Sequence, residues 1–324
     1  MHLCLPKLTI LRRAQCLVLI VIEREIMKSI YLCPVCDQPL LIHEASQGLH
    51  CCKKHHFDKS ENGYWIFSQA KKPQIDSRQI MRAKRFLLES GIFQPIVDKV
   101  EAMITASDLT EGEVSYLDYD CGEGYYLREI KAKLAQSVEG KSIANRLNTY
   151  GITEAENALF SAAKIQSEAK AELNGDDDIV DCDTESDTTF IVSTLKKLPL
   201  ASESLDLVTL IDKQLKGKEL IRVLKPGGLL IQVSPAPRHL WQIKEYIYPD
   251  MKEKALNTPQ SSELELLQTE RASFKLAIDG NQALALLEMT PYAWRANDKV
   301  RKQIADNRFE ALEIDFVVTL SKKK

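Results

Sequence analysis

The stretch at 114–126 most constrains the fold of this chain. It reads as a short apolar strand with an acidic residue near its end, Asp118, then a tight turn with Gly122 and Gly124, then a helix from about Tyr125. Glycine reaches positive φ and leaves no Cβ between the main chain and a ligand. Open α/β sheets bind nucleotide-like ligands at such strand–turn–helix units, beyond the carboxyl end of a strand. The same turn also occurs in sheets that bind no such ligand, so the rest of the chain must decide.

After this turn, expected strands and helices alternate. The run 205–211 is apolar apart from Asp206, which is typical of a strand buried on both faces. Leu-Lys-Pro-Gly-Gly at 224–228 reads as a turn in which proline fixes φ and glycine permits the left-handed conformation. The alternation predicts a mostly parallel, doubly wound α/β sheet. The expected elements are a strand at 148–152, a helix at 154–171, a strand ending at 191–192, a strand at 205–211, a helix up to Leu224, a strand at 229–233 and a late antiparallel strand at 312–320.

Two helices are expected before the turn, after a linker at 71–73. The first runs from Ser77 to Gly91 and the second starts near Pro95. Their core-facing residues are Ile80, Ala83 and Leu87 in the first, and Ile96, Val100, Met103 and Ile104 in the second. The first helix also carries basic residues that could contact phosphate, although such a run is more often a solvated face. These basic residues are Arg78, Arg82, Lys84 and Arg85. Further along, the acidic segment 174–187 is low in apolar residues and is expected to be an exposed, mobile loop.

Four of the eight cysteines fall in one short segment. Cys33 and Cys36 form a C-x2-C knuckle, and the second half offers Cys-x3-His in two registers, Cys51 with His55 or Cys52 with His56. Such a Cys3His set matches a tetrahedral zinc site, with Zn–S bonds near ~2.3 Å. Spacing alone leaves the register open. Because four protein ligands leave no open position, we expect structural zinc that staples a segment too small to fold without it.

Charge and cysteine usage limit the class of protein. The net charge of −3 over 324 residues gives no global attraction to nucleic acid, so any basic surface must be local. Clustered cysteines without a disulfide-scaffold pattern indicate a reducing compartment, and we expect a cytoplasmic protein.

The first 26 residues resemble the start of a signal peptide, with Arg12 and Arg13 before an apolar run at 16–22. The charged run 23–25 stands where a cleavage site should be. The apolar run is also far shorter than the roughly 20 residues that span a membrane. We expect translation to start at Met27, with 1–26 an upstream extension; the alternative is a poorly docked N-terminal strand or helix.

Taken together, the motifs resemble one family, the bacterial 23S ribosomal RNA guanine-N1 methyltransferases. Members join an N-terminal zinc module to a class I methyltransferase domain that binds S-adenosyl-L-methionine. The resemblance covers nearly the whole chain from Met27. We therefore divide the chain into an extension (1–26), a zinc-binding module (27–70), linker and capping helices (71–110) and a methyltransferase domain with a seven-stranded sheet (111–324). The shared runs are Cys-Pro-x-Cys at 33–36, His-x-Phe-Asp at 55–58, Gly-Ile-Phe-Gln-Pro at 91–95, Cys-Gly-Glu-Gly-Tyr-Tyr at 121–126, Leu-Lys-Pro-Gly-Gly at 224–228, Pro-Arg-His-Leu at 237–240 and Met-Thr-Pro-Tyr-Ala-Trp-Arg at 289–295.

The resemblance implies particular ligands. It selects one register for the zinc site, with Cys33, Cys36, Cys51 and His55 as ligands. It places Phe93, as an aromatic lid, with Gly122, Glu123 and His239 against S-adenosylmethionine, although a histidine after proline can also be a simple helix cap. Asp118 and Gly124 belong to the same cofactor motif.

Two residues depart from the family pattern. Asp120 stands where the motif has its first glycine, which adds a negative charge beside the methionine end of the cofactor. Thr153 stands where the family has an aspartate at the end of the second strand, the usual place for gripping the ribose hydroxyls. Glu154, one residue on, could substitute from a different direction. Each lost charged hydrogen bond costs roughly 1.5–3 kcal/mol, so both changes are expected to weaken cofactor binding.

The resemblance implies methyl transfer to N1 of a guanine in a 23S ribosomal RNA hairpin, by an enzyme that the family suggests is a homodimer. The residues do not identify the acceptor of the N1 proton. Two alternatives remain: a weakened or inactive RNA-binding relative, and a methyltransferase acting on a small molecule. The zinc module, with Lys53 and Lys54, is the expected RNA docking surface. Aromatic residues that could stack on the target base, or simply fill the core, are Tyr125, Tyr126, Tyr292 and Trp294.

Overall fold

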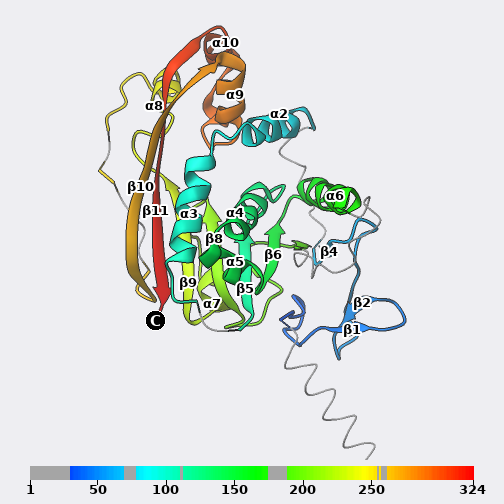
Figure 1. Ribbon diagram of the computed structural model, residues 1–324. Coiled ribbons are helices and arrows are strands. Elements are labelled where there is room, and N and C mark those ends of the chain that lie inside the picture. Colours follow the sequence, from blue (N-terminus) through cyan, green and yellow to red (C-terminus); the bar gives the residue numbers. More distant parts are fainter. Residues whose placement is uncertain (1–29, 69–77, 110–111, 174–187, 254, 257–260) are drawn as a thin grey trace, which may run out of the picture.

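The computed structural model describes residues 30–68, 78–109, 112–173, 188–253, 255–256 and 261–324 (Figure 1). The extension at 1–26, the linker at 71–73, the acidic segment at 174–187 and the side chain of Ile80 lie outside the described residues. Within the described part of the chain, no helix is both long and apolar enough to span a membrane.

One mixed sheet forms the centre of the molecule. Its strand order is β10-β11-β9-β8-β5-β6-β7-β4. The six strands from β9 to β4 are mutually parallel, and β11 and β10 are antiparallel additions at one end. This confirms the prediction of a doubly wound, mostly parallel sheet with a late antiparallel strand. The strands are β4 (Trp65–Ile66), β5 (Val114–Tyr119), β6 (Leu147–Thr153), β7 (Thr189–Val192), β8 (Leu205–Ile211), β9 (Leu224–Pro235), β10 (Leu264–Asp279) and β11 (Arg308–Lys323).

The strand order creates a switch point beside β5. From β5 the chain runs outward through β6 to β7, then returns to place β8 on the other side of β5. In open α/β sheets a ligand binds in the crevice outside the carboxyl ends of the strands at such a point. The glycine turn that follows β5 therefore lies at the position where this fold binds ligands.

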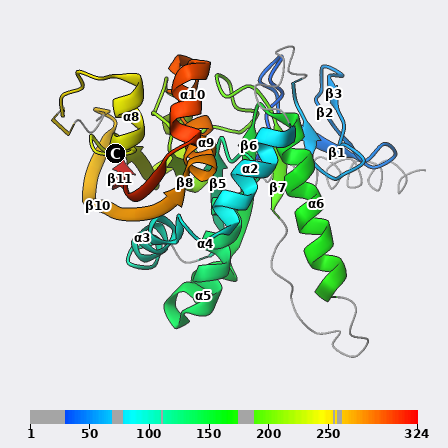
Figure 2. The same cartoon turned by 90° about the horizontal axis from the view of Figure 1, so that it is seen from above.

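The expected helices are present with small shifts at their ends, but Ala83, which was expected to face the core from the first helix, is exposed. Helix α3 buries the four residues expected of it and Val97 as well. In Figure 2, α3, α4 and α5 lie together on one side of the sheet. The helices are α2 (Arg78–Glu89), α3 (Gln94–Thr105), α4 (Tyr125–Gln136), α5 (Val138–Ala144), α6 (Glu156–Leu173), α7 (Glu219–Val223), α8 (Trp241–Ile247), α9 (Gly280–Glu288) and α10 (Asp298–Ala305), with a 3-10 turn at Ala293–Arg295.

Over the residues that the structure describes, the sheet has eight strands, one more than the seven expected, because the N-terminal segment contributes β4. Trp65 pairs with Ile191 and Ile66 pairs with Val192, so β4 extends the sheet beyond β7. The Trp65 side chain is buried at this junction. By pairing with the open edge of β7, these apolar residues gain main-chain hydrogen bonds and become buried or partly buried. A strand of two residues is too short to show the alternation that would predict it from the sequence.

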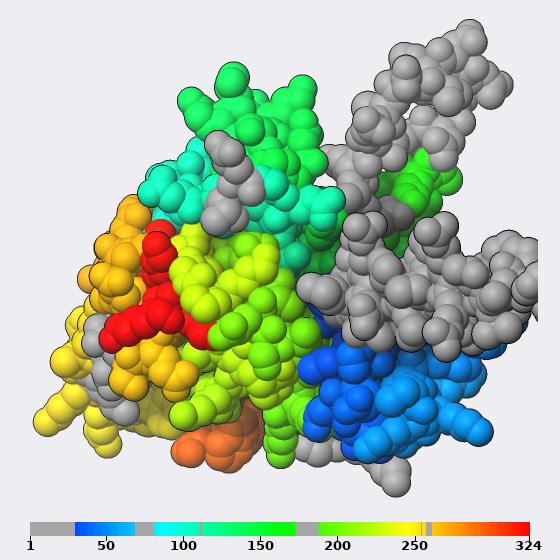
Figure 3. Space-filling view, turned by 90° about the horizontal axis from the view of Figure 1, so that it is seen from below, coloured from blue at the N-terminus to red at the C-terminus, as the bar shows by residue number. Residues whose placement is uncertain are grey.

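A second attachment lies at the start of the same segment. The N–H of Leu32 donates to the carbonyl of Pro199, and the N–H of Ala201 donates to the carbonyl of Ile30. Lys197 lies 2.7 Å from Asp37. Figure 3 shows residues 30–68, in blue, packed against the yellow-green segment that precedes and forms β8 and β9. The N-terminal unit is therefore fastened to the sheet at both of its ends.

The expected turn at 225–228 is an excursion within β9. Leu205 pairs with Leu224 and Leu207 pairs with Leu229, so four residues of β9 face one residue of β8. Gly227 has a φ of 80°, which a residue with a side chain rarely adopts. Proline and glycine thus produce the predicted reversal, but strand pairing resumes on both sides of it.

Candidate functional site

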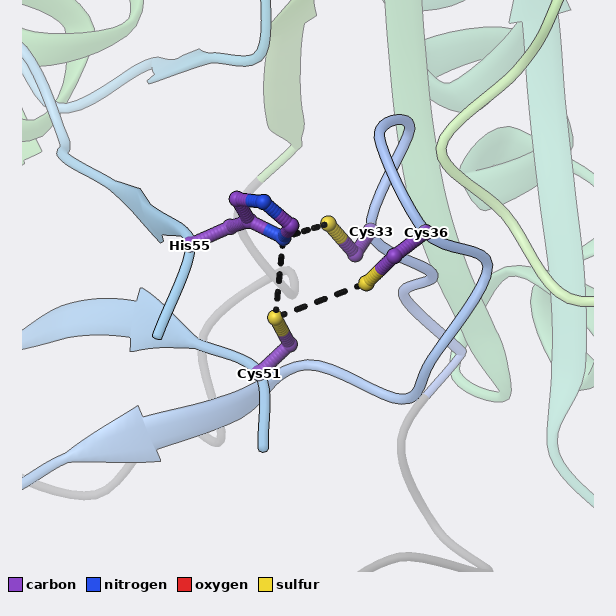
Figure 4. A group of neighbouring side chains, drawn as sticks. All are labelled: Cys33, Cys36, Cys51 and His55. Atoms are coloured by element: carbon purple, nitrogen blue, oxygen red, sulfur yellow. Dashed lines mark hydrogen bonds between the residues drawn. The ribbon is translucent and has the colours of Figure 1, made fainter. Parts of the chain in front are cut away.

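The N-terminal unit brings four potential metal ligands together on two knuckles. It is built on β1 (Leu41–His43), β2 (Gly48–His50) and β3 (His56–Phe57). In the first knuckle the N–H of Asp37 donates to the carbonyl of Cys33, and Asp37 has a φ of 57°. In the second, the N–H of Lys54 donates to the carbonyl of Cys51, and Lys54 has a φ of 64°. These turns aim the side chains of Cys33, Cys36, Cys51 and His55 at one point (Figure 4).

The spacing of the four ligand atoms fits zinc. All lie within 4.8 Å of one another. Cys36 Sγ is 3.7 Å from Cys51 Sγ, and His55 Nδ1 is 3.4 Å from Sγ of both Cys33 and Cys51. A tetrahedron with Zn–S bonds near ~2.3 Å has ligand–ligand edges of about 3.7 Å. Four such ligands would close the coordination shell, which is the pattern of a structural zinc site.

The structure separates the two registers that spacing left open. Cys52 is exposed and its thiol points to Gln38. His56 Nε2 lies 2.5 Å from a carboxylate oxygen of Asp58. Neither residue belongs to the convergent group, whereas Cys51 and His55 do.

The turn after β5 is built from three left-handed residues. Asp120, Gly122 and Gly124 have φ values of 60°, 55° and 69°. A Cβ placed on Gly122 would meet no atom within 4 Å, so the turn is open on that side. A Cβ on Gly124 would lie 3.2 Å from the ring of Phe190, so that glycine also permits close packing beneath the turn.

Glu123 presents an unsatisfied carboxylate oxygen at this turn. Its Oε2 accepts a 2.7 Å hydrogen bond from Nε of Arg85, which comes from α2. Its Oε1 is buried without a hydrogen-bond partner. A buried carboxylate oxygen is costly to leave unpaired, so it favours a ligand that brings a cationic or N–H donor. The amino group of S-adenosylmethionine is such a donor, and the site fits that cofactor at this atom.

Asp118 is placed in the core of the sheet. It is only 3% exposed and accepts a 3.0 Å hydrogen bond from the hydroxyl of Thr209. Burial raises the pKa of Asp118 to about 7, and the nearby charge of Asp120 acts in the same direction. The carboxyl group therefore braces β5 against β8 beneath the turn.

The two departures from the family pattern touch each other. Oδ1 of Asp120 accepts a 3.0 Å hydrogen bond from the hydroxyl of Thr153, and Oδ2 lies 2.8 Å from Nζ of Lys213. Glu154 turns elsewhere, because its Oε1 accepts from the hydroxyl of Thr194 and the N–H of Leu195. Asp120, which adds a carboxylate, and Thr153, which stands where the family has one, thus lie at the same end of the site.

Phe93 and His239 are both buried but in different surroundings. Phe93 makes an edge contact with Tyr126, with ring centroids 6.3 Å apart, and so covers the first turn of α4. His239 packs on Phe316 and accepts a hydrogen bond at Nδ1 from the N–H of Asp315. Burial, and then the charge of Lys244, lower the pKa of His239 to about 3. His239 is therefore neutral, with its proton on Nε2.

The aromatic candidates divide by exposure. Tyr125 is buried in the core cluster, and Tyr126 packs against that cluster. Tyr292 also packs against it and lies edge-on to Tyr248. Trp294 is 73% exposed, with the guanidinium of Arg295 over its ring at 4.4 Å. Among the four, Trp294 is the side chain presented to solvent.

Asp212, which follows β8 directly at the switch point, belongs to no motif that identifies it from the sequence. Its φ is 54°, an uncommon value for a residue with a side chain. Burial raises the pKa of Asp212 to about 7. Burial, and then the charge of Asp212, raise the pKa of both Tyr126 and Tyr292. The sequence feature that could have identified Asp212 is its position as an acidic residue directly after the apolar strand β8.

The chain is similar to known proteins in both of its parts. Residues 31–66 match a family model for a zinc ribbon described as "RlmA, N-terminal". YxjB of Bacillus subtilis (strain 168), provisionally named a 23S rRNA (guanine-N(1)-)-methyltransferase, is 24% identical over 85% of this chain and 90% of its own length. The 23S rRNA (guanine(748)-N(1))-methyltransferase of Streptomyces fradiae is 23% identical over 85% of this chain and 89% of its length.

Among solved structures, a SAM-dependent methyltransferase from Aquifex aeolicus is 14% identical. The match covers 75% of this chain and 97% of that one, with a TM-score of 0.38. The resemblance noted in the sequence is confirmed by the zinc ribbon and by the two relatives.

Proposed function

We propose that this chain is an S-adenosylmethionine-dependent methyltransferase that acts on N1 of a guanine in 23S ribosomal RNA. The relatives named for that reaction align over most of both chains, and residues 31–66 separately match the zinc ribbon model. The observation that carries the proposal is the buried, unpaired Oε1 of Glu123 beside the open turn at Gly122. In a protein of this fold that bound no cofactor, this buried oxygen would be destabilising without any compensating contact.

The residues around the turn have separate parts in holding the cofactor. Glu123 binds the amino group, with its carboxylate oriented by Arg85. Gly122 leaves room for the ligand, and Phe93 covers the first turn of α4. When bound, the cofactor supplies an electrophilic sulfonium methyl group, so alignment with the acceptor accounts for most of the catalysis.

Asp212 is the proposed proton acceptor. Guanine N1 carries a proton that must leave as the nitrogen is methylated. A general base works best with a pKa near the working pH. Asp212 lies at the carboxyl end of β8, across the switch point from the turn, and its pKa of about 7 meets that requirement. Its carboxylate takes the N1 proton.

RNA docking is assigned to the exposed residues of the N-terminal unit and of the 3-10 turn. Lys53 and Lys54 are exposed on the second knuckle, and Trp294 with Arg295 forms an exposed aromatic and cationic pair. The N1 edge is hidden in a base pair, so the target guanine must be in a loop or turned out of its stem. Aromatic stacking is the usual way to hold such a base.

The proposed location is the cytoplasm, and the proposed assembly is a homodimer. A ribosomal RNA substrate and reduced zinc-binding thiolates fit the cytoplasm, and a homodimer is proposed from the family resemblance alone. Light scattering of the purified protein measures its mass in solution directly.

The decisive test is primer extension on 23S ribosomal RNA from a strain that lacks the gene. N1-methylguanine blocks pairing and stops reverse transcription, so one stop is expected to vanish in the deletion strain and return with the wild-type gene. An unchanged set of stops would exclude the ribosomal role. Calorimetry with S-adenosylmethionine separates an active enzyme from an RNA-binding relative, because the relative would bind hairpin RNA without binding the cofactor.

A further inference from the structure

Asp120 adopts a backbone conformation that favours glycine. Its φ of 60° lies in the left-handed region, where aspartate and asparagine are tolerated better than most residues with side chains. Strained residues of this kind persist when surrounding contacts hold them, and they cluster at binding sites. The side chain of Asp120 is held on both sides, by Thr153 and by Lys213.

The carboxylate of Asp120 reaches from the end of β5 to the end of β6. Tyr119 pairs with Ile152 in the parallel ladder, so Asp120 and Thr153 are the next residues on the two strands. Thr153 is buried, whereas the Asp120 side chain is 23% exposed. Of the two positions 120 and 153, residue 120 therefore supplies the carboxylate, and part of it reaches solvent.

The other nearby carboxylate is committed to a different loop. Glu154 accepts hydrogen bonds of 3.2 Å from the Thr194 hydroxyl and 3.1 Å from the Leu195 N–H, beyond the end of β7. It closes that loop. In nucleotide-binding doubly wound sheets an acidic side chain near the end of the second strand accepts the ribose hydroxyls. In this protein Asp120 is the acidic side chain near the end of that strand, β6.

We propose that Asp120 binds the ribose diol of the adenosyl ligand and so replaces a carboxylate at position 153. A carboxylate offers about four lone-pair sites, and Thr153 and Lys213 use two of them. The remaining two suit the vicinal hydroxyls of a ribose. Thr153 and Lys213 are positioning residues that fix the carboxylate. The inference rests on the proposed function and specifies how its cofactor site works.

The test is an exchange of the two positions. Asp120→Gly restores the glycine and removes the carboxylate, and it is expected to weaken S-adenosylhomocysteine binding about 10- to 100-fold by calorimetry. The double variant Asp120→Gly with Thr153→Asp returns a carboxylate from β6 and is expected to recover most of that loss. Asp120→Asn, which keeps the size of the side chain, is expected to weaken binding as well.

A second ligand separates ribose binding from a merely structural role. The 2′-deoxy analogue of S-adenosylhomocysteine is expected to bind wild type at least about tenfold more weakly than the parent compound, because one charged hydrogen bond is lost. The Asp120→Gly variant is expected to bind both ligands equally. A change in folding alone would weaken both ligands in parallel and keep their ratio.

The outcomes distinguish the inference from the proposed function. If Asp120→Gly binds as tightly as wild type, or keeps the discrimination against the deoxy ligand, the ribose assignment is overturned and the methyltransferase proposal stands. If wild type binds neither adenosyl ligand, both are overturned. If wild type binds and discriminates but the 23S RNA stop is unchanged on deletion, the ribose assignment stands and the ribosomal role is excluded.

Discussion

Arg85 of α2 donates a 2.7 Å hydrogen bond to the carboxylate of Glu123 in the turn after β5. The helix that carries Arg85 packs on α9, close to the C-terminal part of the chain (Figure 1). The hydrogen bond to Glu123 raises the pKa of Arg85 above its ordinary value. The cation that orients Glu123 at the proposed cofactor site thus comes from α2.

Replacing Arg85 with Gln is expected to weaken S-adenosylmethionine binding several-fold. The variant frees Glu123 to turn toward solvent, and its carboxylate would no longer be oriented for the ligand. Calorimetry measures the change. Arg82→Gln, on an exposed position of the same helix, is the matched control and is expected to bind as wild type does. Equal affinity in both variants would show that Arg85 does not orient Glu123.

Asp212→Asn is expected to remove most of the methyl-transfer rate. The acceptor must be ionised, and the pKa of Asp212 is about 7. The wild-type rate is therefore expected to fall about tenfold for each pH unit below 7 and to level off above it. Single-turnover methylation of a hairpin RNA between pH 5.5 and 8.5 measures this profile. Asp250→Asn, at an exposed position after α8, is expected to keep both the rate and the slope; an unchanged slope in Asp212→Asn would assign the proton to another group.

Cys51→Ser is expected to lose zinc and to lower the thermal midpoint of the whole protein. The zinc unit shares a core with the sheet, in which Cys33 and Leu40 pack with Leu117 and Ile152. Metal content by mass spectrometry and unfolding by circular dichroism report the two effects. Cys52→Ser is the matched control, because Cys52 is exposed and outside the ligand group. Zinc lost equally from both variants would contradict the assigned register.

Asp118→Asn is expected to change how stability depends on pH. The folded pKa of Asp118 is about 7, above its ordinary value of 3.8. The folded state therefore holds the proton more tightly than the unfolded state, and wild-type stability falls as pH rises from about 4 to 7. Asparagine cannot ionise, so the variant should lose less stability over that range, by an amount on the order of a few kcal/mol. Urea unfolding at pH 5 and pH 8 provides the comparison; parallel losses would place the titration elsewhere.

The sequence predicted most of the fold because its signals were local. The apolar run at β8 and the glycines after β5 each determine one element by themselves. The pairing of β4 with β7 could not be read, because two residues carry no periodicity and the partner strand lies more than 120 residues away.

The candidate site was harder to predict than the fold. Motif positions identified Glu123, but its unpaired oxygen depends on where Arg85 arrives from α2. Motif positions assign Asp120 and Thr153 to opposite ends of the ligand, because sequence order does not show which strand ends are neighbours. In the structure each directly follows a residue of the last β5–β6 pair, and a hydrogen bond joins their side chains. Asp212 carried no motif, and its significance comes from burial and from the switch point.

The added strand β4 has a further consequence for solubility. Without it, β7 would end the sheet with the bare main chain of Thr-Phe-Ile-Val, a sequence well suited to recruiting a strand from another molecule. The backbone of β4, at the end of the N-terminal unit, pairs with that edge. Chelation of the zinc ion is therefore expected to promote edge-to-edge aggregation of molecules whose parallel sheet is still folded.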